Sequence, residues 1–168
     1  MEIEQKIKTL NEPFVHLVIT DEIYELTKIN LKDTFKYILI DGKKCMDVES
    51  LFNEFSTKME FPDYFGRNWS AFDECINDLS WLSAQGYVMF ISDVDQVLVK
   101  EDKDFRILMD ILYDCCEEWS QGREYGEFIT IPCPFHIILH SNMKIGSPTI
   151  SRLKQIGIEE IDIIKREA

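Results

Sequence analysis

The chain of 168 residues carries 18 lysines and arginines against 31 aspartates and glutamates, a formal net charge of −13. Proteins that hold nucleic acid or an anionic membrane surface do so mainly with basic side chains, so this balance excludes both as expected partners and favours a basic one. With 45% hydrophobic and 12% aromatic residues, the chain is too apolar to be a solvated acidic tail and is expected to fold.

The length fits one domain. No internal repeat, low-complexity stretch or Gly/Ser-rich linker interrupts the chain, so we expect residues 1–168 to form a single unit. The five cysteines are odd in number and show no CxxC spacing, which favours reduced thiols. The first residues are acidic where a signal peptide needs basic ones, and no apolar run approaches the roughly 18 residues of a membrane span. We therefore expect a cytoplasmic protein.

Short apolar runs alternate with segments of helical period. A strand at 14–19 is expected at an edge of the sheet, followed by a short helix near 22–28. A buried strand at 37–41 leads to a helix at 47–58, for which Asp47 is the candidate cap. A second helix starts near Asn68, with an apolar stripe at 69, 72, 76 and 79.

The second half of the chain continues this alternation. A buried strand at 87–91 precedes a long helix from Asp104 to 119, and a strand at 135–139 follows two prolines that exclude a helix there. Ser147 and Pro148 predict the cap and first residue of a helix that Gly157 closes, before a further strand at 158–163. Apolar strands separated by helices predict an α/β fold with a small, mainly parallel sheet covered on both faces.

Acidic residues gather in the middle of the chain. Residues 62–128 hold 15 acidic and 5 basic side chains, a net charge of −10. Glu74 and Asp78 are four residues apart on one predicted helix, and Asp110, Asp114 and Glu118 repeat at the same spacing on the next. Like charges at this spacing repel by about 0.2–0.5 kcal/mol per pair. The pattern has two interpretations, a solvated face of an acidic protein or an anionic patch that docks a cationic partner.

One segment carries a family resemblance. Residues 61–75 read Phe-Pro-Asp-Tyr-Phe-Gly-Arg-Asn-Trp-Ser-Ala-Phe-Asp-Glu-Cys. They resemble the signature of the barstar-like ribonuclease inhibitors, a turn with proline, an acid, two aromatics, glycine and asparagine before a short acidic helix. The order of predicted elements also fits, so the resemblance covers 35–142 and leaves an N-terminal extension, 1–34, and a C-terminal helix-strand extension, 143–168. It implies a three-layer barstar-like fold with three core strands. The N-terminal and C-terminal extensions could each add one strand to this sheet.

The resemblance also implies a function. Members of this family are intracellular inhibitors of antitoxin or immunity type, which bind a basic ribonuclease one to one and block its active site with the acidic helix and the preceding loop. No enzymatic activity, cofactor or metal is implied, and the free protein is expected to be a monomer. A ribonuclease cleft uses basic side chains to bind phosphate, so a carboxylate on a rigid helix can take the phosphate position.

The expected partner contacts are carried over residue by residue. Glu74 stands at the family's principal inhibitory aspartate and is expected to mimic the phosphate, and Tyr64 matches the loop aromatic. The whole expected set is Tyr64, Gly66, Asn68, Ser70, Asp73, Glu74, Asp78, Asp114 and Glu118. Ser70 replaces an aspartate that commonly faces the enzyme, and Asp73 stands where barstar has an aromatic residue. These departures indicate a target other than barnase.

Several of these residues also have a purely structural interpretation. Tyr64 and Trp69 fit core or half-buried aromatics, and Asn68 fits a helix cap. Gly66 fits the turn that leads into the helix, where it would allow a close backbone approach or a positive φ.

Two other functions remain open at this point. An adaptor or immunity protein that binds a basic partner other than a nuclease is favoured by Ser70 and Asp73. A metal-dependent hydrolase would use Asp93 and Asp95, which follow a strand, although a role in capping the loop is preferred for them.

The remaining reactive side chains predict no catalytic group. His136 and His140 lie on one side of a buried strand without metal-ligand spacing, and His16 is isolated in the sequence, so structural histidines are expected. Cys115 and Cys116 lie on a packed helix, where burial raises a thiol pKa and disfavours a nucleophile.

Overall fold

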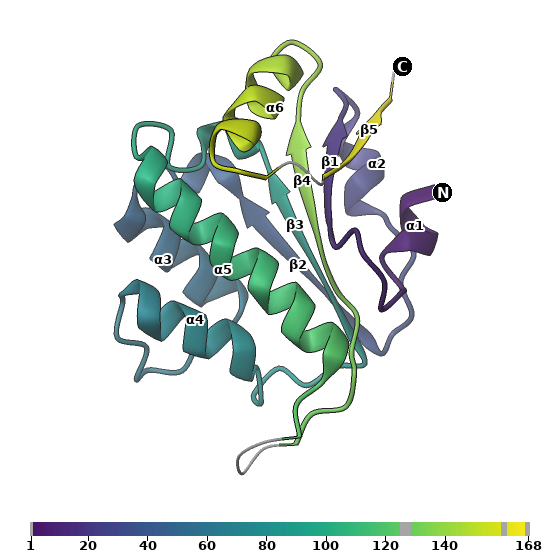
Figure 1. Cartoon of the computed structure of the whole chain (residues 1–168), viewed down its shortest axis with the longest axis vertical. Helices are drawn as coiled ribbons and strands as arrows, with labels where there is room; N and C mark the ends of the chain where they lie inside the picture. Colours follow the sequence, from purple (N-terminus) through teal and green to yellow (C-terminus); the bar gives the residue numbers. More distant parts are fainter. Residues whose placement is uncertain (1, 125–128, 159–160, 167–168) are drawn as a thin grey trace.

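The structure, a computed structural model, describes residues 2–124, 129–158 and 161–166. Helices and strands alternate along most of the chain, as Figure 1 shows. In chain order the elements are α1 (Glu2–Lys6), β1 (Val15–Ile19), α2 (Ile23–Thr27), β2 (Phe35–Asp41), η1 (Gly42–Lys44), α3 (Val48–Lys58), α4 (Trp69–Asp78), β3 (Gly86–Ser92), η2 (Val94–Gln96), α5 (Asp102–Gln121), β4 (Phe135–Ser141), α6 (Gly146–Gln155) and β5 (Asp162–Lys165), where η marks a 3-10 helix.

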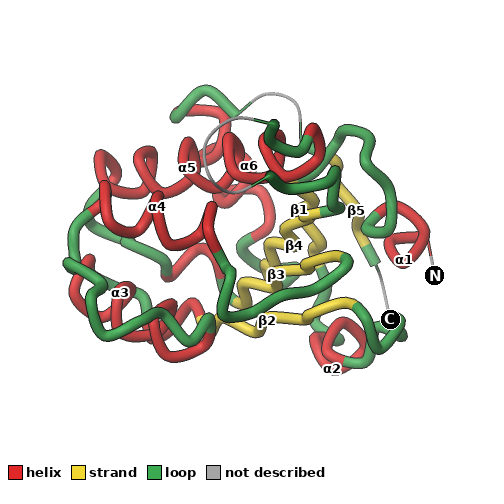
Figure 2. Tube along the Cα trace, turned by 90° about the horizontal axis from the view of Figure 1, so that it is seen from below, coloured by secondary structure: helices red, strands yellow, loops and turns green. Residues whose placement is uncertain are grey.

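The five strands form one sheet in the order β2-β3-β4-β1-β5, and every pairing is parallel. Helices α3, α4, α5 and α6 lie on one face, and α1 and α2 lie on the other (Figure 2). The predicted α/β class, with a mainly parallel sheet between helices, is confirmed. No helix in the described ranges is both long and apolar enough to cross a membrane.

The N-terminal strand is interior, and its prediction as an edge strand was wrong. β1 pairs with β4 on one side and β5 on the other, and all five of its residues are buried. Such an unbroken apolar run is typical of a strand covered on both faces. The predicted strand at 158–163 includes residues 159 and 160, which lie outside the described residues, and β5 is seen at Asp162–Lys165.

Most predicted helices are found, with two corrections at their starts. α3 follows the Asp47 cap as predicted, and the Asp47 side chain accepts a hydrogen bond from the Ser50 amide at 2.8 Å. α5 begins at Asp102, before the predicted Asp104. α6 begins at Gly146 after Ile145, so Ser147 is not its cap. A Cβ at Gly146 would meet the Ile19 side chain at 2.8 Å, so this glycine lets the helix start close against β1.

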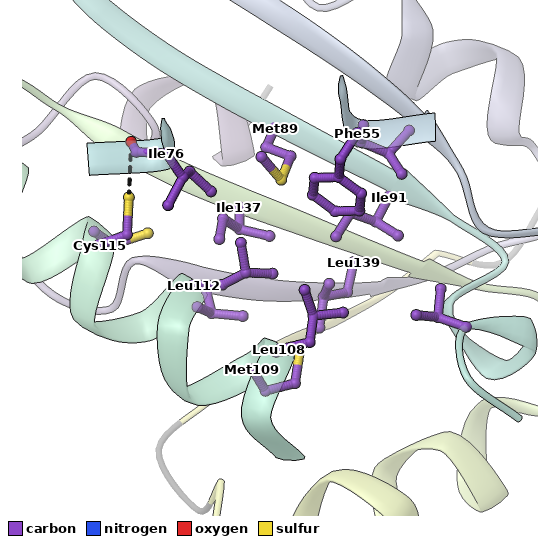
Figure 3. Close-up of a cluster of buried hydrophobic side chains, with 14 of the residues drawn as sticks. Phe55, Ile76, Met89, Ile91, Leu108, Met109, Leu112, Cys115, Ile137 and Leu139 are labelled. Carbon is purple, nitrogen blue, oxygen red and sulfur yellow. Dashed lines mark hydrogen bonds between the residues drawn. The ribbon is translucent and has the colours of Figure 1, made fainter. Parts of the chain in front are cut away.

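The core between the sheet and α3, α4 and α5 is a continuous apolar cluster, part of which Figure 3 shows. Leu108 and Leu112 of α5 meet Ile137 and Leu139 of β4 there, all fully buried. Burying a side chain of this size contributes about 1.5–3 kcal/mol. This packing fixes α5 on the sheet and makes it the base on which α4 rests.

All five cysteines are unpaired and buried. Burial raises the pKa of Cys115 well above its ordinary value and raises that of Cys116 as well. The predicted direction of both shifts is confirmed. A thiol with a raised pKa stays protonated and is a poor nucleophile. The Cys115 thiol instead donates to the Ile76 carbonyl oxygen at 3.6 Å, which ties α5 to α4 (Figure 3).

A chain of hydrogen bonds joins both terminal extensions to the sheet. The Thr9 carbonyl oxygen accepts from His136 Nε2 at 2.8 Å, so His136 Nδ1 accepts from His16 Nε2 at 3.0 Å. His16 Nδ1 lies 2.8 Å from Asp162 Oδ2. Because His16 Nε2 donates to His136, this second contact is a hydrogen bond when either His16 Nδ1 or the Asp162 carboxyl group carries a proton. His16 is therefore not isolated, as the sequence had indicated, because parallel pairing of β1 and β4 places the two histidines together.

Burial governs the charge of these histidines. It lowers the pKa of His136 to about 4, against the opposing effect of the bond to Thr9. Burial also lowers the pKa of His16, and the Asp162 carboxylate opposes that shift. Both His136 and His140 are buried and hydrogen-bonded, which confirms the structural role predicted for them.

We predict that acid destabilises the protein through His136. In the unfolded chain a histidine titrates near pH 6.5, so the unfolded state binds more protons than the folded state as the pH falls below that value. Between pH 8 and pH 5 this difference lowers the free energy of unfolding by about 2 kcal/mol. Urea denaturation at both pH values should show that the free energy of unfolding falls less between pH 8 and pH 5 in the His136→Gln variant than in the wild type. An equal loss in both proteins would contradict the prediction, and the comparison cancels the contribution of the carboxylates.

Candidate functional site

The loop before α4 alternates inward and outward aromatic side chains. Phe61 and Phe65 pack edge to face at 5.0 Å, and Phe65 also contacts Phe52 of α3. Tyr64 points the other way and is 74% exposed. The left-handed residue of this turn is Arg67, with φ 53°, so the positive φ considered for Gly66 was wrong. The Arg67 guanidinium donates to Asn53 Oδ1 at 2.8 Å and ties the loop to α3.

Two side chains fix the start of α4. Asn68 is its cap, since its Oδ1 accepts from the Ala71 amide at 2.8 Å. Its Nδ2 donates to the Gly66 carbonyl oxygen at 3.3 Å, which holds the turn as well. Trp69 is half-buried against Phe52 and Phe72, and its indole N–H donates to Asp104 of α5 at 2.9 Å. Asn68 and Trp69 thus have the structural roles considered for them from the sequence.

The outward side of α4 carries Ser70, Glu74 and Asp78, all exposed. Phe72, Cys75 and Ile76 form the buried side, so the amphipathic period of the helix sets which residues face water. Desolvation raises the pKa of the Tyr64 phenol, and the nearby groups Asp78, Cys75 and Glu74 add smaller effects in the same direction. Tyr64, Glu74 and Asp78 therefore form one exposed group.

A second group of carboxylates lies across the boundary between α4 and α5, which run side by side on the same face of the sheet (Figures 1 and 2). Desolvation and the charge of Glu118 raise the pKa of Asp73, and Asn77 opposes the shift. Desolvation, with Asp110 and two glutamates of α5, raises the pKa of Asp114. We call both groups together the acidic face, formed by Tyr64, Ser70, Asp73, Glu74, Asp78, Asp114 and Glu118.

Arg123 joins the two helices beneath this face. Its guanidinium donates to Glu118 Oε2 at 2.9 Å and to the Asn77 carbonyl oxygen at 2.7 Å, and it lies over the Trp119 ring. Asn77 in turn donates to Asp73 Oδ1 at 2.9 Å. Glu118 therefore forms an ion pair with Arg123 of the same chain. None of the ion pairs found among the described residues involves Glu74.

Sequence reasoning missed Arg123, Arg67 and Asn77. None of them belongs to an apolar stripe, and Arg67 occupies a position of the 61–75 segment to which the resemblance assigns no role. Their partners lie on other elements or one helical turn away. The one sequence feature that could have indicated Arg123 is its position as one of 5 basic residues in the acidic stretch 62–128.

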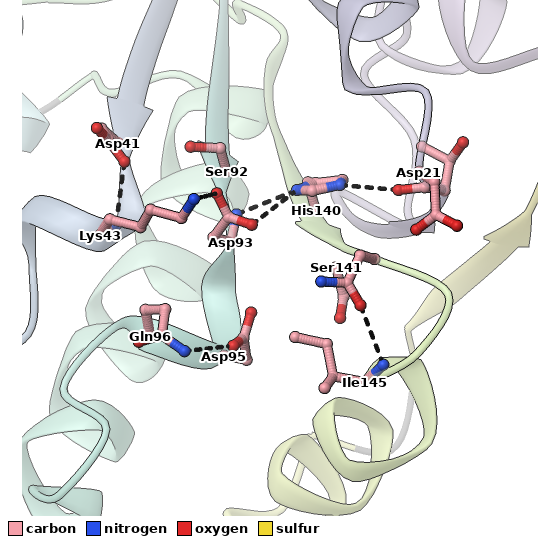
Figure 4. A network of polar contacts seen from close by, with 12 residues as sticks. Asp21, Asp41, Lys43, Ser92, Asp93, Asp95, Gln96, His140, Ser141 and Ile145 are labelled. Atoms are coloured by element: carbon pink, nitrogen blue, oxygen red, sulfur yellow. Dashed lines mark hydrogen bonds and ion pairs between the residues drawn. The ribbon is translucent and has the colours of Figure 1, made fainter.

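The polar residues at the carboxyl end of β3 are engaged with one another (Figure 4). The Asp93 amide donates to His140 Nδ1 at 3.1 Å, and Lys43 Nζ lies 3.9 Å from the Asp93 carboxylate. Asp93 stands at the cap position of η2 but makes no capping bond with its side chain, so that expected role was wrong. Gln96 donates to Asp95. Within the described ranges, no three His, Cys, Asp or Glu side chains are grouped so as to hold a metal ion.

The fold and the site define a class of protein: a parallel α/β domain that presents a rigid, carboxylate-rich pair of helices. Residues 35–131 match the family described as barstar, the barnase inhibitor, and the chain belongs to this family. The chain is also 41% identical over 39 residues to a protein of Bacillus subtilis (strain 168) named "Putative ribonuclease inhibitor YrdF". That stretch is 23% of this chain and 43% of the relative, so the chain spans less than half of the relative's length.

We predict that Asn68→Ala lowers the free energy of unfolding by about 1 kcal/mol, because it removes the oxygen that caps α4. Asn68→Asp keeps a capping oxygen and should stay within about 0.5 kcal/mol of the wild type. Urea denaturation of the three proteins at pH 7 measures both effects. An alanine variant as stable as the wild type would show that the cap is dispensable.

Proposed function

We propose that this protein inhibits a basic ribonuclease by binding it one to one and covering its active site with the acidic face. The observation that carries the proposal is an exposed group formed by Tyr64 of the loop and by Glu74 and Asp78 of α4, a helix fixed by its cap and by Trp69. Membership of the barstar family and the name of the B. subtilis relative support the same conclusion.

In this mechanism Glu74 takes the position of an RNA phosphate. Basic side chains that bind phosphate in a ribonuclease cleft can donate charge-assisted hydrogen bonds to its carboxylate. Because α4 is held at its start by Asn68 and in its last turn by Arg123, little conformational freedom is lost on binding. Tyr64 supplies an exposed aromatic ring beside the carboxylate, a residue type enriched at interfaces.

Long-range attraction would speed the encounter. The acidic face belongs to a stretch with a net charge of −10, and opposite fields on two proteins raise the rate of association. The same charge favours a monomer before capture, since two acidic faces repel each other. Five buried, unpaired thiols suit the reducing cytoplasm, where we place the inhibitor as an antitoxin or immunity protein.

We also propose that the extensions 1–34 and 143–168 belong to the same domain as the core at 35–142. Strand β1 of the first extension and β5 of the second continue the sheet beyond β4. Neither strand contributes a residue to the acidic face, so their role in this proposal is to complete the fold.

A second candidate is an adaptor that binds a basic protein other than a nuclease. It is favoured by Ser70, which lacks the carboxylate that family members commonly present, and by Glu118, which is occupied by Arg123. Two positions of the expected contact set thus offer a partner less negative charge.

We predict that the purified protein inhibits RNA cleavage by at least one member of a panel of basic barnase-type ribonucleases, with an end point at one inhibitor per enzyme. Glu74→Gln should weaken that complex by at least about 10-fold, because it removes the charge at the phosphate position. The matched control is Glu25→Gln on α2, at the opposite face of the sheet, which should change the affinity by less than about 2-fold.

Titration calorimetry and cleavage of a fluorescent RNA measure these effects. Inhibition of no panel member would overturn the proposal and favour the adaptor. Equal affinities of the Glu74→Gln variant and the wild type would remove Glu74 from the mechanism.

We further predict that Ser70→Asp raises the affinity for barnase by about 10-fold or more. The new carboxylate stands one turn before Glu74 on the exposed side of α4, where it adds a second charge toward the cleft. Near the start of a helix an aspartate is also compatible with the helix dipole. Ser70→Asn has the same shape without the charge and is the control. Equal binding of the aspartate and asparagine variants would contradict the prediction.

A further inference from the structure

A pocket of about 570 Å³ opens beside the end of α4. The segment after this helix forms one wall with Leu79 and Ala84, and Ile129 and Ile131 line it from the other side. Trp119 of α5 also lines it. The volume falls in the range of pockets that bind drug-sized groups.

Two large apolar side chains beside the pocket are exposed to water. Ile129 is 73% exposed and Ile131 is 81% exposed. The segment that carries them is tied to the end of α5 by backbone bonds, since Thr130 exchanges two hydrogen bonds of 2.9 Å with Arg123 and the Cys133 amide donates to the Trp119 carbonyl oxygen. Fixed and exposed apolar side chains beside a pocket mark a surface that a partner covers.

Polar groups at the pocket indicate the chemistry of that partner. Asp78, which belongs to the acidic face, stands at the mouth and is the last residue of α4. Arg123 already meets the partial negative charge of this helix end at the Asn77 carbonyl oxygen, so Asp78 is the anionic group that the pocket offers to a cation. Thr130 also lines the pocket, and its Oγ1 is buried and makes no hydrogen bond in the part of the chain that the structure describes.

We propose that this pocket receives an apolar side chain of the same basic protein that the acidic face binds, with a neighbouring lysine or arginine of that protein on Asp78. The inference rests on the proposed function and adds a second contact to it. The pocket and the acidic face share Asp78, so one partner surface can cover both.

Two other occupants fit the observations less well. A small molecule inside the pocket would leave Ile129 and Ile131 in water, whereas a protein surface covers the pocket and its rim together. A second copy of this chain would bring its own Asp78 and a net charge of −13 against the same mouth. Charge complementarity therefore selects a basic protein.

The two contacts should respond differently to salt. Ion pairs on the acidic face are screened as the ionic strength rises, whereas burial of Ile129 and Ile131 is not. The test is calorimetric titration with the panel ribonuclease that the wild type inhibits most strongly, at NaCl concentrations from about 50 to 500 mM. The variants are the double substitution Ile129→Ser with Ile131→Ser, and Glu74→Gln for comparison.

We expect the double variant to bind at least about 10-fold more weakly at every salt concentration, with the salt dependence of the wild type. Glu74→Gln should instead flatten that dependence. The matched control is Tyr24→Ser, because Tyr24 is 65% exposed on α2 at the opposite face, and it should leave the affinity within about 2-fold. Thermal unfolding of each variant checks that the fold is intact.

Hydrogen exchange provides a second measurement that needs no substitution. In the complex the amides of residues 129–131 should exchange more slowly than in the free protein. If the ribonuclease binds and Glu74→Gln weakens it, but the double variant binds like the wild type without slowed exchange, this inference fails alone. If no panel ribonuclease binds, the proposed function and this inference fail together.

Discussion

Carboxylates on α4 and α5 repel one another across the boundary between the two helices, and the rest of the structure must hold them there. Desolvation and the charges of Glu118 and Asp114 on α5 raise the pKa of Asp73, and desolvation with the charges of its own helix raises the pKa of Asp114. Apolar burial beneath them opposes this repulsion, with help from Arg123 and the Trp69 hydrogen bond to Asp104. A cationic partner relieves this repulsion. The free energy that the repulsion costs the free protein therefore contributes to binding.

The two layers of helices have different roles in this arrangement. The layer with α3, α4 and α5 carries the acidic face and rests on the larger apolar cluster. The layer with α1 and α2 covers a smaller cluster, and the hydrogen bonds of His16 and His136 lie near it. Changes at the histidines should therefore alter stability, while changes at Glu74 should alter binding.

Local patterns in the sequence predicted local structure well. Apolar runs predicted the strands from β2 to β4, and Asp47 and Asn68 marked two helix starts because a capping side chain bonds within three residues of itself. The spacing of acids predicted which carboxylates share a helix. Short-range geometry is enough for all of these predictions.

Predictions that depended on distant pairing failed or were not possible. β1 looked like an edge strand because nothing in residues 14–19 shows that β5 will pair on its far side. Ser147 matched the cap pattern, yet the helix begins at Gly146, where Ile19 leaves no room for a Cβ. The bonds of Arg123 and the contact of His16 with His136 depend on elements brought together only by the fold.

The position of β1 also bears on how the chain is made. His16 and His136 meet across 120 residues of sequence, and β1 cannot pair with β4 until that later strand has left the ribosome. The pairings of β2 with β3 and of β3 with β4 involve no strand before Phe35, and no residue of the acidic face lies before it. The first strand to be synthesised is thus an apolar segment that waits longest for its partner, the stage at which newly made chains are most exposed to aggregation and to chaperones.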